Sequence, residues 1–431
     1  MGPGRIFGRG LSRGSTRGMS RAISRRAPLP AEEIERPALR PPPSGLLPAA
    51  DAGGAQPRPQ IVPGPFGFPS EEEKVTDGAA NKAIALKNCR NVVFRDFTIY
   101  HGGHFAILAT AVDNWTVDGL KIDTNHDGIN FDCCQNVRVS NCTVNSPLDD
   151  ALCLKSSFAL GCARPTENIT ITNCQVSGYD IGTLLDGTRQ HKVNYGKSRC
   201  GRIKLGTESN GGFRNITISN CVFEYGRGLA LESVDGGPME DITISNIILR
   251  DIVNAPIFIR LGARLRAPDG TKVGTARRIK IENLIAHNVA AQSGILISGV
   301  PGHFIEDLSL SNIFIDYEGG GTKEQGERVV PELERGYPEP TAFRTIPAWG
   351  LFVRHVKNCS IDRVEFRCVR EEQRPTVMLD DVIDARFDDV TLPHAPGATS
   401  FALKHVNGFT VHHSPNLPET SRTQLIENEK L

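Results

Sequence analysis

The sequence has few aromatic residues, no excess of charge of either sign and no long apolar run, and each of these gaps excludes a class of protein. Aromatic residues make up 6% of the 431 residues, while Lys and Arg together number 49, as do Asp and Glu. A balanced charge gives no reason to expect nucleic acid or an acidic membrane as a partner. No apolar run approaches the roughly 20 residues that span a bilayer, and the basic N-terminus lacks the apolar segment of a secretory signal.

Signatures of metal sites and of a disulfide framework are also missing. The 11 cysteines contain no C-x-x-C pair of the zinc type, and no EF-hand or nonapeptide calcium repeat occurs. Five cysteines directly follow an asparagine: Asn88-Cys89, Asn141-Cys142, Asn173-Cys174, Asn220-Cys221 and Asn358-Cys359. This pattern favours small buried residues at a repeated turn over a disulfide framework. We expect neither a metal nor a cofactor.

Residues 1–80 differ in composition from the rest of the chain. Residues 5–26 are rich in Arg, Gly and Ser, and residues 27–69 are rich in Pro. Such segments bury too little apolar surface to offset the entropy of ordering, so we predict a mobile arm or a long loop. An Arg-rich nucleic-acid tail is the alternative, but acidic residues at 32, 33 and 35 interrupt it. Residues 2–10 also look like a first strand and turn, which suggests that Met1 is an internal start.

From residue 81 onward, a short pattern returns along the chain. Apolar and polar residues alternate, a small residue or Asn turns the chain, and a second strand begins, which is the period of a β-strand. Successive copies start 22, 23 or 26 residues apart where no loop intervenes. The clearest copies start at these residues: Asn91, Asn114, Asn136, Asn168, Asn215 and Asp241.

Repeats of this length predict a solenoid whose coils stack in parallel, because one coil cannot bury its inner face alone. A β-sandwich also has frequent turns, but its strands do not repeat one sequence at one period. We therefore predict an all-β chain with a single parallel β-helix over residues 81–412 and a polar tail over residues 413–431. Insertions at 156–166, 186–201 and 316–348 leave the coils, and loops of this length are usually functional or disordered.

Three carboxylates fall one repeat apart. Asp127 precedes Asp149 by 22 residues, and Asp150 follows directly, so adjacent coils would project all three into one groove. Like charges held together leave one acid protonated near neutral pH. Glycosidic cleavage needs such an acid and a second carboxylate that activates water, roughly 6.5–9.5 Å apart in inverting enzymes. The plainer alternative is that these residues cap turns, as Asp-Gly at 127–128 commonly does.

Two motifs resemble those of glycoside hydrolase family 28, the polygalacturonases. Asn125-His-Asp127-Gly-Ile resembles N-x-D-G-I, and Asp149-Asp150-Ala-Leu-Cys-Leu-Lys155-Ser156 resembles D-D-x-I-x-x-K-S. The resemblance covers most of residues 81–315, and the insertion after Ser156 is similar to that of the bacterial, exo-acting branch. It implies a right-handed, single-stranded parallel β-helix of the pectin lyase-like type. It also implies inverting hydrolysis of galacturonan or rhamnogalacturonan in pectin.

The same resemblance implies the roles of individual residues. Asp149 or Asp150 would be the general acid, and Asp127 with the remaining member of the pair would activate water. Asn125 and Lys155 would contact the substrate, which is a pectic poly- or oligosaccharide. The family is usually secreted or periplasmic, and we expect a monomer.

The family's Gly-His-Gly and Arg-Ile-Lys motifs are not both present. Gly201-Arg202-Ile203-Lys204 is either the Arg-Ile-Lys motif or, in the alignment we favour, the Gly-His-Gly coil. In the favoured alignment Ala230-Leu231-Glu232 takes the Arg-Ile-Lys position, and in neither does a His fall at the family's position. Glu232 in place of Lys would repel a uronate and favour a neutral sugar. Basic residues of neighbouring coils could restore the charge: Arg202, Lys204, Arg260, Arg264 and Arg266.

His104 lies one coil before Asp127 and could face the groove, although a surface His is the commoner case. Two other functions remain open. A polysaccharide lyase or epimerase on the same fold would use clustered carboxylates, commonly with Ca²⁺, and an Arg or Lys base. A non-catalytic carbohydrate-binding solenoid would explain the missing His as lost activity.

Overall fold

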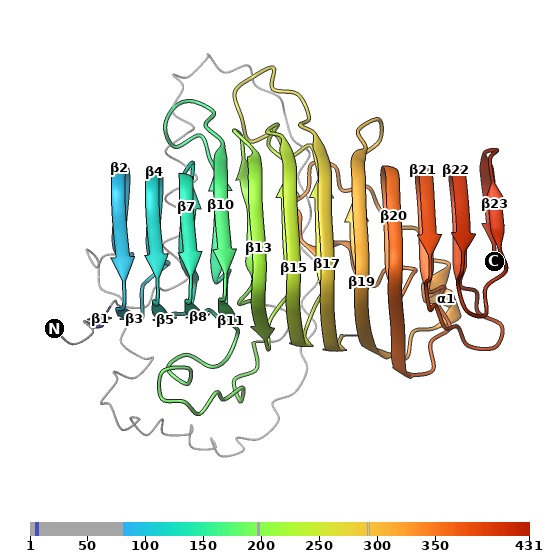
Figure 1. Cartoon of the computed structure of the whole chain (residues 1–431), viewed down its shortest axis with the longest axis horizontal. Helices are drawn as coiled ribbons and strands as arrows, with labels where there is room; N and C mark the ends of the chain where they lie inside the picture. The colour runs from blue at the N-terminus through green and yellow to red at the C-terminus, as the bar shows by residue number, and fades with distance from the viewer. Residues whose placement is uncertain (1–4, 8–80, 196–198, 291, 293) are drawn as a thin grey trace, which may run out of the picture.

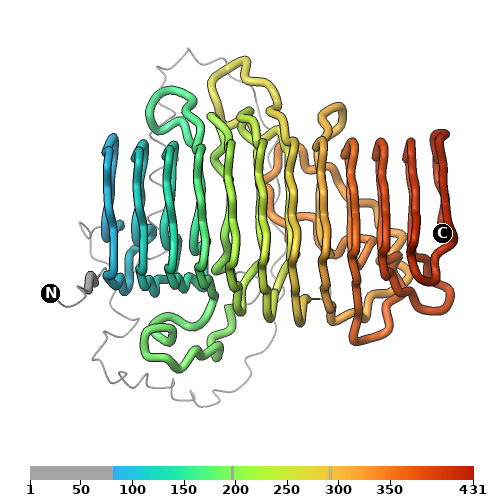
Figure 2. Tube along the Cα trace, in the orientation of Figure 1, coloured from blue at the N-terminus to red at the C-terminus, as the bar shows by residue number. Residues whose placement is uncertain are grey.

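The computed structural model describes residues 5–7, 81–195, 199–290, 292 and 294–431 of the chain. Within these residues the chain winds into a right-handed parallel β-helix, in which all strands belong to one connected set. The coils follow one another in chain order along the long axis, from β2 at one end to β22 at the other (Figures 1 and 2). The predicted solenoid and its fold class are therefore confirmed.

Each coil has three faces. The first face, which carries the candidate site, consists of short parallel strands: β6 (Asp127–Asp132), β9 (Leu152–Ser156), β12 (Ile203–Ser209), β14 (Leu229–Ser233), β16 (Ile257–Leu261) and β18 (Ile295–Ser298). Short strands of the other two faces are β1 (Arg5–Phe7), β3 (Thr98–Tyr100), β5 (Lys121–Asp123), β7 (Gln135–Ser140), β8 (Thr143–Asn145), β10 (Thr166–Thr172) and β11 (Gln175–Ser177).

Longer strands turn a corner and continue from one face onto the next. They are β2 (Lys82–Arg95), β4 (Phe105–Asp118), β13 (Phe213–Glu224), β15 (Met239–Ile252), β17 (Ala276–Val289), β19 (Ile305–Gly319), β20 (Leu351–Arg370), β21 (Val377–Asp388) and β22 (Phe401–His412).

The alternation of apolar and polar residues fills the interior with aliphatic ladders. Ile218 pairs with Ile244, which pairs with Ile281 in the next coil, and all three are at most 1% exposed. Burying one such side chain contributes roughly 1.5–3 kcal/mol, and the ladder repeats this gain in every coil.

The corners explain the recurring asparagines. Asn220, Asn246 and Asn283 all have a positive φ, between 53° and 57°, a region that Asn adopts more readily than most residues. The side-chain amide of Asn246 donates to Asn220 over 3.0 Å, and that of Asn283 donates to Asn246 over 3.2 Å. Of the five cysteines that follow an Asn, four are buried, and all eleven are free. The predicted repeated turn is therefore confirmed.

The two ends of the described chain also pair with the solenoid. β1 lies parallel to β3, which agrees with the first strand expected near residues 2–10, whereas the predicted arm at 8–80 lies outside the described residues. Residues 413–431 are more than the polar tail that we expected. They form β23 (Thr420–Arg422) and β24 (Ile426–Lys430), antiparallel to β22. The backbone groups at the open edge of β22 supply the hydrogen bonds that order this segment.

The longest insertion, residues 320–350, contains helix α1 (Lys323–Gly326) and a 3-10 helix (Pro340–Phe343). It packs on the outer side of the first face through a second apolar cluster. That cluster is formed by Ala230, Ala255, Phe258, Leu296, Val330, Phe343, Ile346, Ala348 and Phe352. The loop therefore covers the first face from β14 to β20. No helix among the described residues is long and apolar enough to cross a membrane.

Candidate active site

The three predicted carboxylates converge where two coils meet. Asp127 opens β6, and Asp149 and Asp150 come immediately before β9 in the next coil. One oxygen of each carboxylate lies within 4.8 Å of the other two. Asp127 and Asp150 are 2% and 3% exposed, whereas Asp149 is half-buried.

The 4.8 Å limit joins one oxygen of each carboxylate, whereas the roughly 6.5–9.5 Å of an inverting enzyme separates whole carboxyl groups, so that separation stays a prediction. Parallel strands stack about 4.8 Å apart, so carboxylates directly above one another can bring their nearest oxygens to about that distance.

Asp150 is held as a carboxylate by two cations of the next coil. Arg202 donates from Nε to Asp150 over 2.7 Å, and the Lys204 ammonium lies 3.2 Å from the other oxygen. Burial alone would raise the pKa of Asp150, but Lys204 and Arg202 outweigh it and hold that pKa well below its usual range.

The pKa of Asp149 is shifted in the opposite direction. Burial raises the pKa of Asp149 well above its usual range, and the charges of Asp127 and Asp150 raise it further, against the weaker effect of Lys204 and Lys155. The site thus contains two adjacent aspartates, of which one keeps its proton and the other does not.

Asp127 is oriented from both sides. The Lys155 ammonium lies 3.2 Å from its Oδ2, the Asn130 amide donates to the same oxygen over 3.0 Å, and the backbone N–H of Asp150 approaches Oδ1 at 3.3 Å. Lys155 also reaches Glu208 at 3.8 Å, so it links the buried cluster to a carboxylate at the surface.

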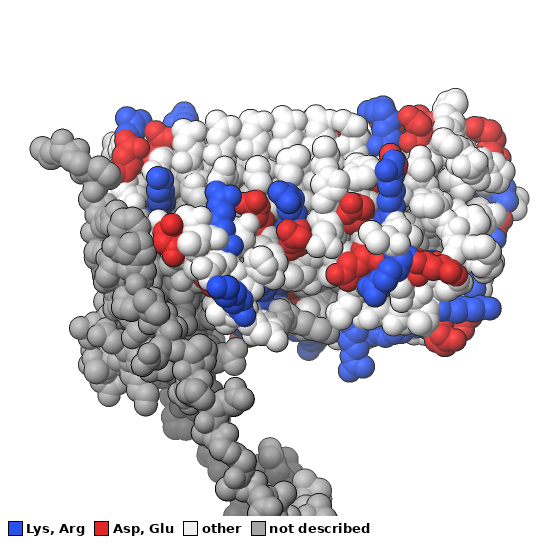
Figure 3. All heavy atoms as spheres, turned by 90° about the horizontal axis from the view of Figure 1, so that it is seen from below, with Lys and Arg blue, Asp and Glu red and all other residues white. Residues whose placement is uncertain are grey.

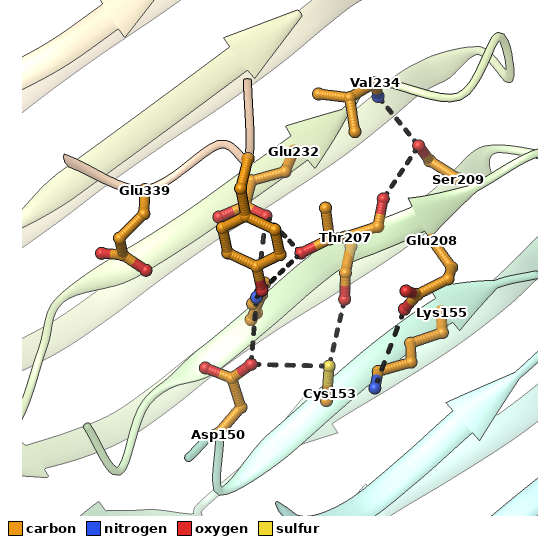
Figure 4. A network of polar contacts seen from close by, with 12 residues as sticks. Asp150, Cys153, Lys155, Thr207, Glu208, Ser209, Glu232, Val234 and Glu339 are labelled. Carbon is orange, nitrogen blue, oxygen red and sulfur yellow. Dashed lines mark hydrogen bonds and ion pairs between the residues drawn. The ribbon is translucent and has the colours of Figure 1, made fainter. Parts of the chain in front are cut away.

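The coil order agrees with the alignment that we favoured for residues 201–204. Lys204 pairs with Cys153 of β9 on one side and with Ala230 of β14 on the other, so Glu232 lies one coil further on. Glu232 is fully buried, accepts a hydrogen bond from Thr207 over 3.1 Å and lies 3.7 Å from Lys204. Figure 4 shows Asp150 and Glu232 directed toward the same space.

Glu232 keeps its proton more readily than a surface glutamate. Burial raises its pKa to about 7, against the lowering effect of Lys204 and Arg202. As a neutral acid it would repel a uronate less than an ionised carboxylate would.

Two of the remaining predicted residues, His104 and Asn125, lie near the three aspartates. His104 belongs to the site, because its charge interacts with those of Asp127 and Lys155. Burial is the main cause that lowers the pKa of His104; Asp127 opposes this effect and Lys155 adds to it. The centre of its ring lies 5.2 Å from that of His126. Asn125 precedes Asp127 by two residues, and its backbone carbonyl accepts a hydrogen bond from the backbone N–H of Leu148 over 3.0 Å.

The arginines of later coils that could supply charge already form hydrogen bonds or ion pairs within the protein. Arg260 is 1% exposed and donates to Ser298 over 2.7 Å and to the backbone of the 320–350 loop at Glu332 over 2.7 Å. Arg264 forms an ion pair with Asp235, and the backbone N–H of Arg266 donates to the same aspartate. Arg260 therefore anchors the 320–350 loop, and the supply of charge to a uronate by these arginines stays a prediction.

Several residues of the site were not identified from the sequence. The 320–350 loop brings Tyr337 and Glu339 over the cluster, and Glu339 comes from a segment separate from the strands in Figure 4. The Tyr337 hydroxyl lies 3.4 Å from the Lys204 ammonium and 3.1 Å from the Thr207 hydroxyl. The loop's length indicated a functional insertion, but no spacing within it distinguished these two residues.

The surface seen from below the solenoid is mixed in charge. Lys and Arg stand beside Asp and Glu along the length of the molecule in Figure 3, and neither sign dominates this face. Such a surface does not provide the single-sign field that draws in a polyanion.

The three aspartates are also the described residues that come together closely enough to hold a metal ion. Lys155 is paired with Asp127, and Lys204 with Asp150, so two ammonium groups already supply the positive charge that a cation would bring. The donor set therefore fits a proton-transfer site better than a metal centre.

A family model described as a right-handed β-helix region matches residues 71–180 and 106–267. A search of curated proteins gave no match. Among solved structures, a hyperthermoactive exopolygalacturonase from Thermotoga maritima is 21% identical over 58% of this chain and 54% of its own, with a TM-score of 0.45. These findings concern the fold.

Two further structures are similar at the same level. A family 28 exopolygalacturonase from Yersinia enterocolitica is 15% identical over 74% of this chain and 45% of its own, with a TM-score of 0.48. The catalytic domain of a family 87 α-1,3-glucanase in complex with nigerose is 14% identical over 76% of this chain and 51% of its own, with a TM-score of 0.45. The chain thus spans about half the length of each solved structure.

Proposed function

We propose that this protein is a glycoside hydrolase of the polygalacturonase family that cleaves glycosidic bonds in a pectic poly- or oligosaccharide. The observation that carries the proposal is the convergence of Asp127, Asp149 and Asp150, one oxygen of each lying within 4.8 Å of the others. Their surroundings raise the pKa of Asp149 and lower that of Asp150. A protonated acid beside an ionised carboxylate is what hydrolysis of an acetal requires.

In this mechanism Asp149 donates its proton to the leaving oxygen. Asp127 and Asp150 orient the attacking water, and Asp127 accepts the one proton that this water loses, because both oxygens of Asp150 are already paired with Arg202 and Lys204. Inversion is the expected stereochemical outcome, because both oxygens of Asp150 are paired with Arg202 and Lys204 and so make a poor covalent nucleophile. As the family resemblance implies, we propose that the enzyme acts outside the cytoplasm.

The alternatives are less compatible with the charges of the site. A lyase or epimerase needs a neutral Lys or an Arg as its base, but the pKa values of Lys155 and Lys204 are raised well above the usual range by the surrounding carboxylates, which outweigh burial. A non-catalytic binding solenoid would not need two neighbouring acids in opposite protonation states.

The test is to replace each aspartate by asparagine and measure reducing sugars released from pectic oligosaccharides. We expect Asp149→Asn and Asp150→Asn each to lower kcat by roughly 10²–10⁴-fold, with the far-ultraviolet circular dichroism unchanged. The wild-type rate should fall as pH rises through the raised pKa of Asp149, because the acid loses its proton there. Glu282→Gln, at an exposed position of β17, serves as the control.

Three outcomes would contradict the proposal. Unchanged turnover in Asp150→Asn would remove the mechanism. An unsaturated product that absorbs in the ultraviolet would indicate a lyase. Tight oligosaccharide binding without any turnover in the wild type would indicate a binding protein. Proton NMR of the first product reports the anomer, and retention would contradict the inverting route.

A further inference from the structure

The carboxylate of Glu339 is bound by donors from three consecutive coils. Arg202 donates to its Oε2 over 3.1 Å, and Arg227 donates to the same oxygen over 2.9 Å. The Asn254 amide donates to Oε1 over 3.1 Å. Two guanidinium groups and an amide converging on one carboxylate form the arrangement with which proteins recognise a carboxylate ligand.

These donors stand at the same turn of successive coils. Arg202 precedes β12, Arg227 precedes β14 and Asn254 precedes β16, and the backbone N–H of Arg227 donates to Cys200 of the coil before. Because Arg202 also binds Asp150, this row of donors is continuous with the acidic cluster. A sugar bound at Asp149 and Asp150 would therefore present its substituents to this row.

Glu339 is held in place by the packing of its loop. The prolines on either side of it, Pro338 and Pro340, are buried, and Phe343 of the following 3-10 helix is 1% exposed within the second apolar cluster. Arg260 and Arg354 bind backbone carbonyls of the same loop. The carboxylate is thus a fixed part of the site.

The charges around the cluster are already matched. The cations are Lys155, Arg202, Lys204 and Arg227, and the ion-paired carboxylates are Asp127, Asp150, Glu208 and Glu339. The raised pKa values of Asp149 and Glu232 leave these two acids protonated in the acid range and add no charge there. A uronate entering this row would bring a negative charge that lacks a partner among these groups.

We propose that Glu339 is an internal counter-ion that fills the carboxylate subsite of Arg202, Arg227 and Asn254, so that the sugar unit bound beside the acidic cluster is uncharged. This specificity rests on the proposed hydrolase function. The sugar is then a neutral hexose or deoxyhexose unit, not a uronate. Tyr337, two residues before Glu339 and 53% exposed, offers an aromatic surface to such a sugar.

The test compares two substrates that differ only in charge. Galacturonan oligosaccharides and the same oligosaccharides after carboxyl reduction to galactose units have the same linkages. We expect the wild type to have the higher kcat/KM for the reduced form. Glu339→Gln, which keeps the shape and removes the charge, should shift the ratio toward the uronate form by at least about tenfold.

Two matched variants separate charge from structure. Glu339→Asp retains the charge and should keep the wild-type preference, and Glu334→Gln, at an exposed acid of the same loop, should leave the ratio unchanged. Glu339→Ala removes the same charge and provides the same comparison if the Gln variant folds poorly. An unchanged ratio in the charge-removing variants, or a wild type that prefers the uronate form, would overturn the inference.

Calorimetric binding keeps this test independent of turnover. The two oligosaccharides are titrated into the Asp149→Asn variant and into the double variant that carries Asp149→Asn and Glu339→Gln. Tighter uronate binding caused by Glu339→Gln supports the counter-ion role even if no variant cleaves either substrate, in which case only the proposed hydrolysis fails. No gain in uronate binding overturns the counter-ion role, whatever the activity of the wild type.

Discussion

Neighbouring residues in this site differ in charge because they touch different partners. Asp150 is paired with Arg202 and Lys204, whereas Asp149, one residue earlier, faces the charges of Asp127 and Asp150. Asp150 therefore lies among cations, whereas Asp149 lies among anions. The same principle applies to Glu232, because burial raises its pKa to about 7, against the lowering effect of Lys204 and Arg202, so that it is about half-protonated at pH 7.

Replacement of Glu232 by Gln should stabilise the protein, and the gain should grow with pH. The pKa of this carboxyl is about 4.5 in the unfolded chain and about 7 in the folded protein. Between these values the unfolded chain is ionised first, so the contribution of Glu232 to stability falls as pH rises and is constant above about pH 7. We expect the Tm difference between Glu232→Gln and wild type to be small at pH 4.5 and to level off above pH 7.

Thermal unfolding by circular dichroism across pH 4.5–8 checks this expectation. Glu282→Gln, at an exposed position, should show a Tm difference that does not change with pH. A Glu232→Gln variant that loses stability with rising pH would show that the ionised carboxylate is needed by Lys204 and Arg202.

At the level of elements, the 320–350 loop acts as a wall of the site. Its contacts with the first face are apolar through Phe343 and polar through the carbonyls that Arg260 and Arg354 bind. A loop with its own buried side chains stays in one place, and Tyr337 and Glu339 therefore have defined positions beside the aspartates.

Phe343→Ala should loosen this wall. Removing a buried Phe costs about 3–5 kcal/mol, and the loss here falls mainly on the loop because the coil ladders remain intact. We expect faster amide hydrogen exchange and proteolytic cleavage within residues 320–350, with the exchange of β13 and β15 unchanged. Val329→Ala, at a side chain that is 83% exposed, is the matched control. Equal protection of the loop in both variants would contradict the packing role of Phe343.

For the whole molecule, the stacking of coils explains why the solenoid is elongated and why its terminal coils need a cover. Each coil pairs with the one before and the one after it, so the solenoid has two terminal edges with unpaired backbone groups. At the C-terminal end β23 and β24 reverse direction and pair with β22, which removes that edge from solvent. Ile426, 8% exposed, packs this segment against the core.

Removing residues 413–431 should make the protein self-associate. The shortened chain would expose β22 as a parallel-sheet edge, which is a template for pairing with another copy. We expect an apparent mass in light scattering that rises with concentration, whereas the full chain stays constant. Leu425→Ala, at an exposed residue of the same segment, should behave as wild type. A truncated chain of constant mass would contradict the capping role of β23 and β24.

The sequence indicated much of the fold and the centre of the site, because both depend on a period. Asp127 and Asp149 are one coil apart, and any chain that repeats at that length places them together. The preferred alignment of residues 201–204 came instead from a longer run of Gly and Asn that it shares with the family. The separation of the two catalytic functions stays a prediction, because a repeat length gives adjacency but not the direction of a side chain within the coil.

By itself, the sequence determined a stack of β coils with three acids on one side, since alternation and repeat length fix which residues face inward and which coils are neighbours. Only the tertiary structure decided what surrounds those acids. Glu339 and Arg202 are 137 residues apart, and their contact depends on how a non-repeating loop packs on a distant coil. The protonation states of Asp149, Asp150 and Glu232 follow from such contacts, because burial and neighbouring charges set a pKa.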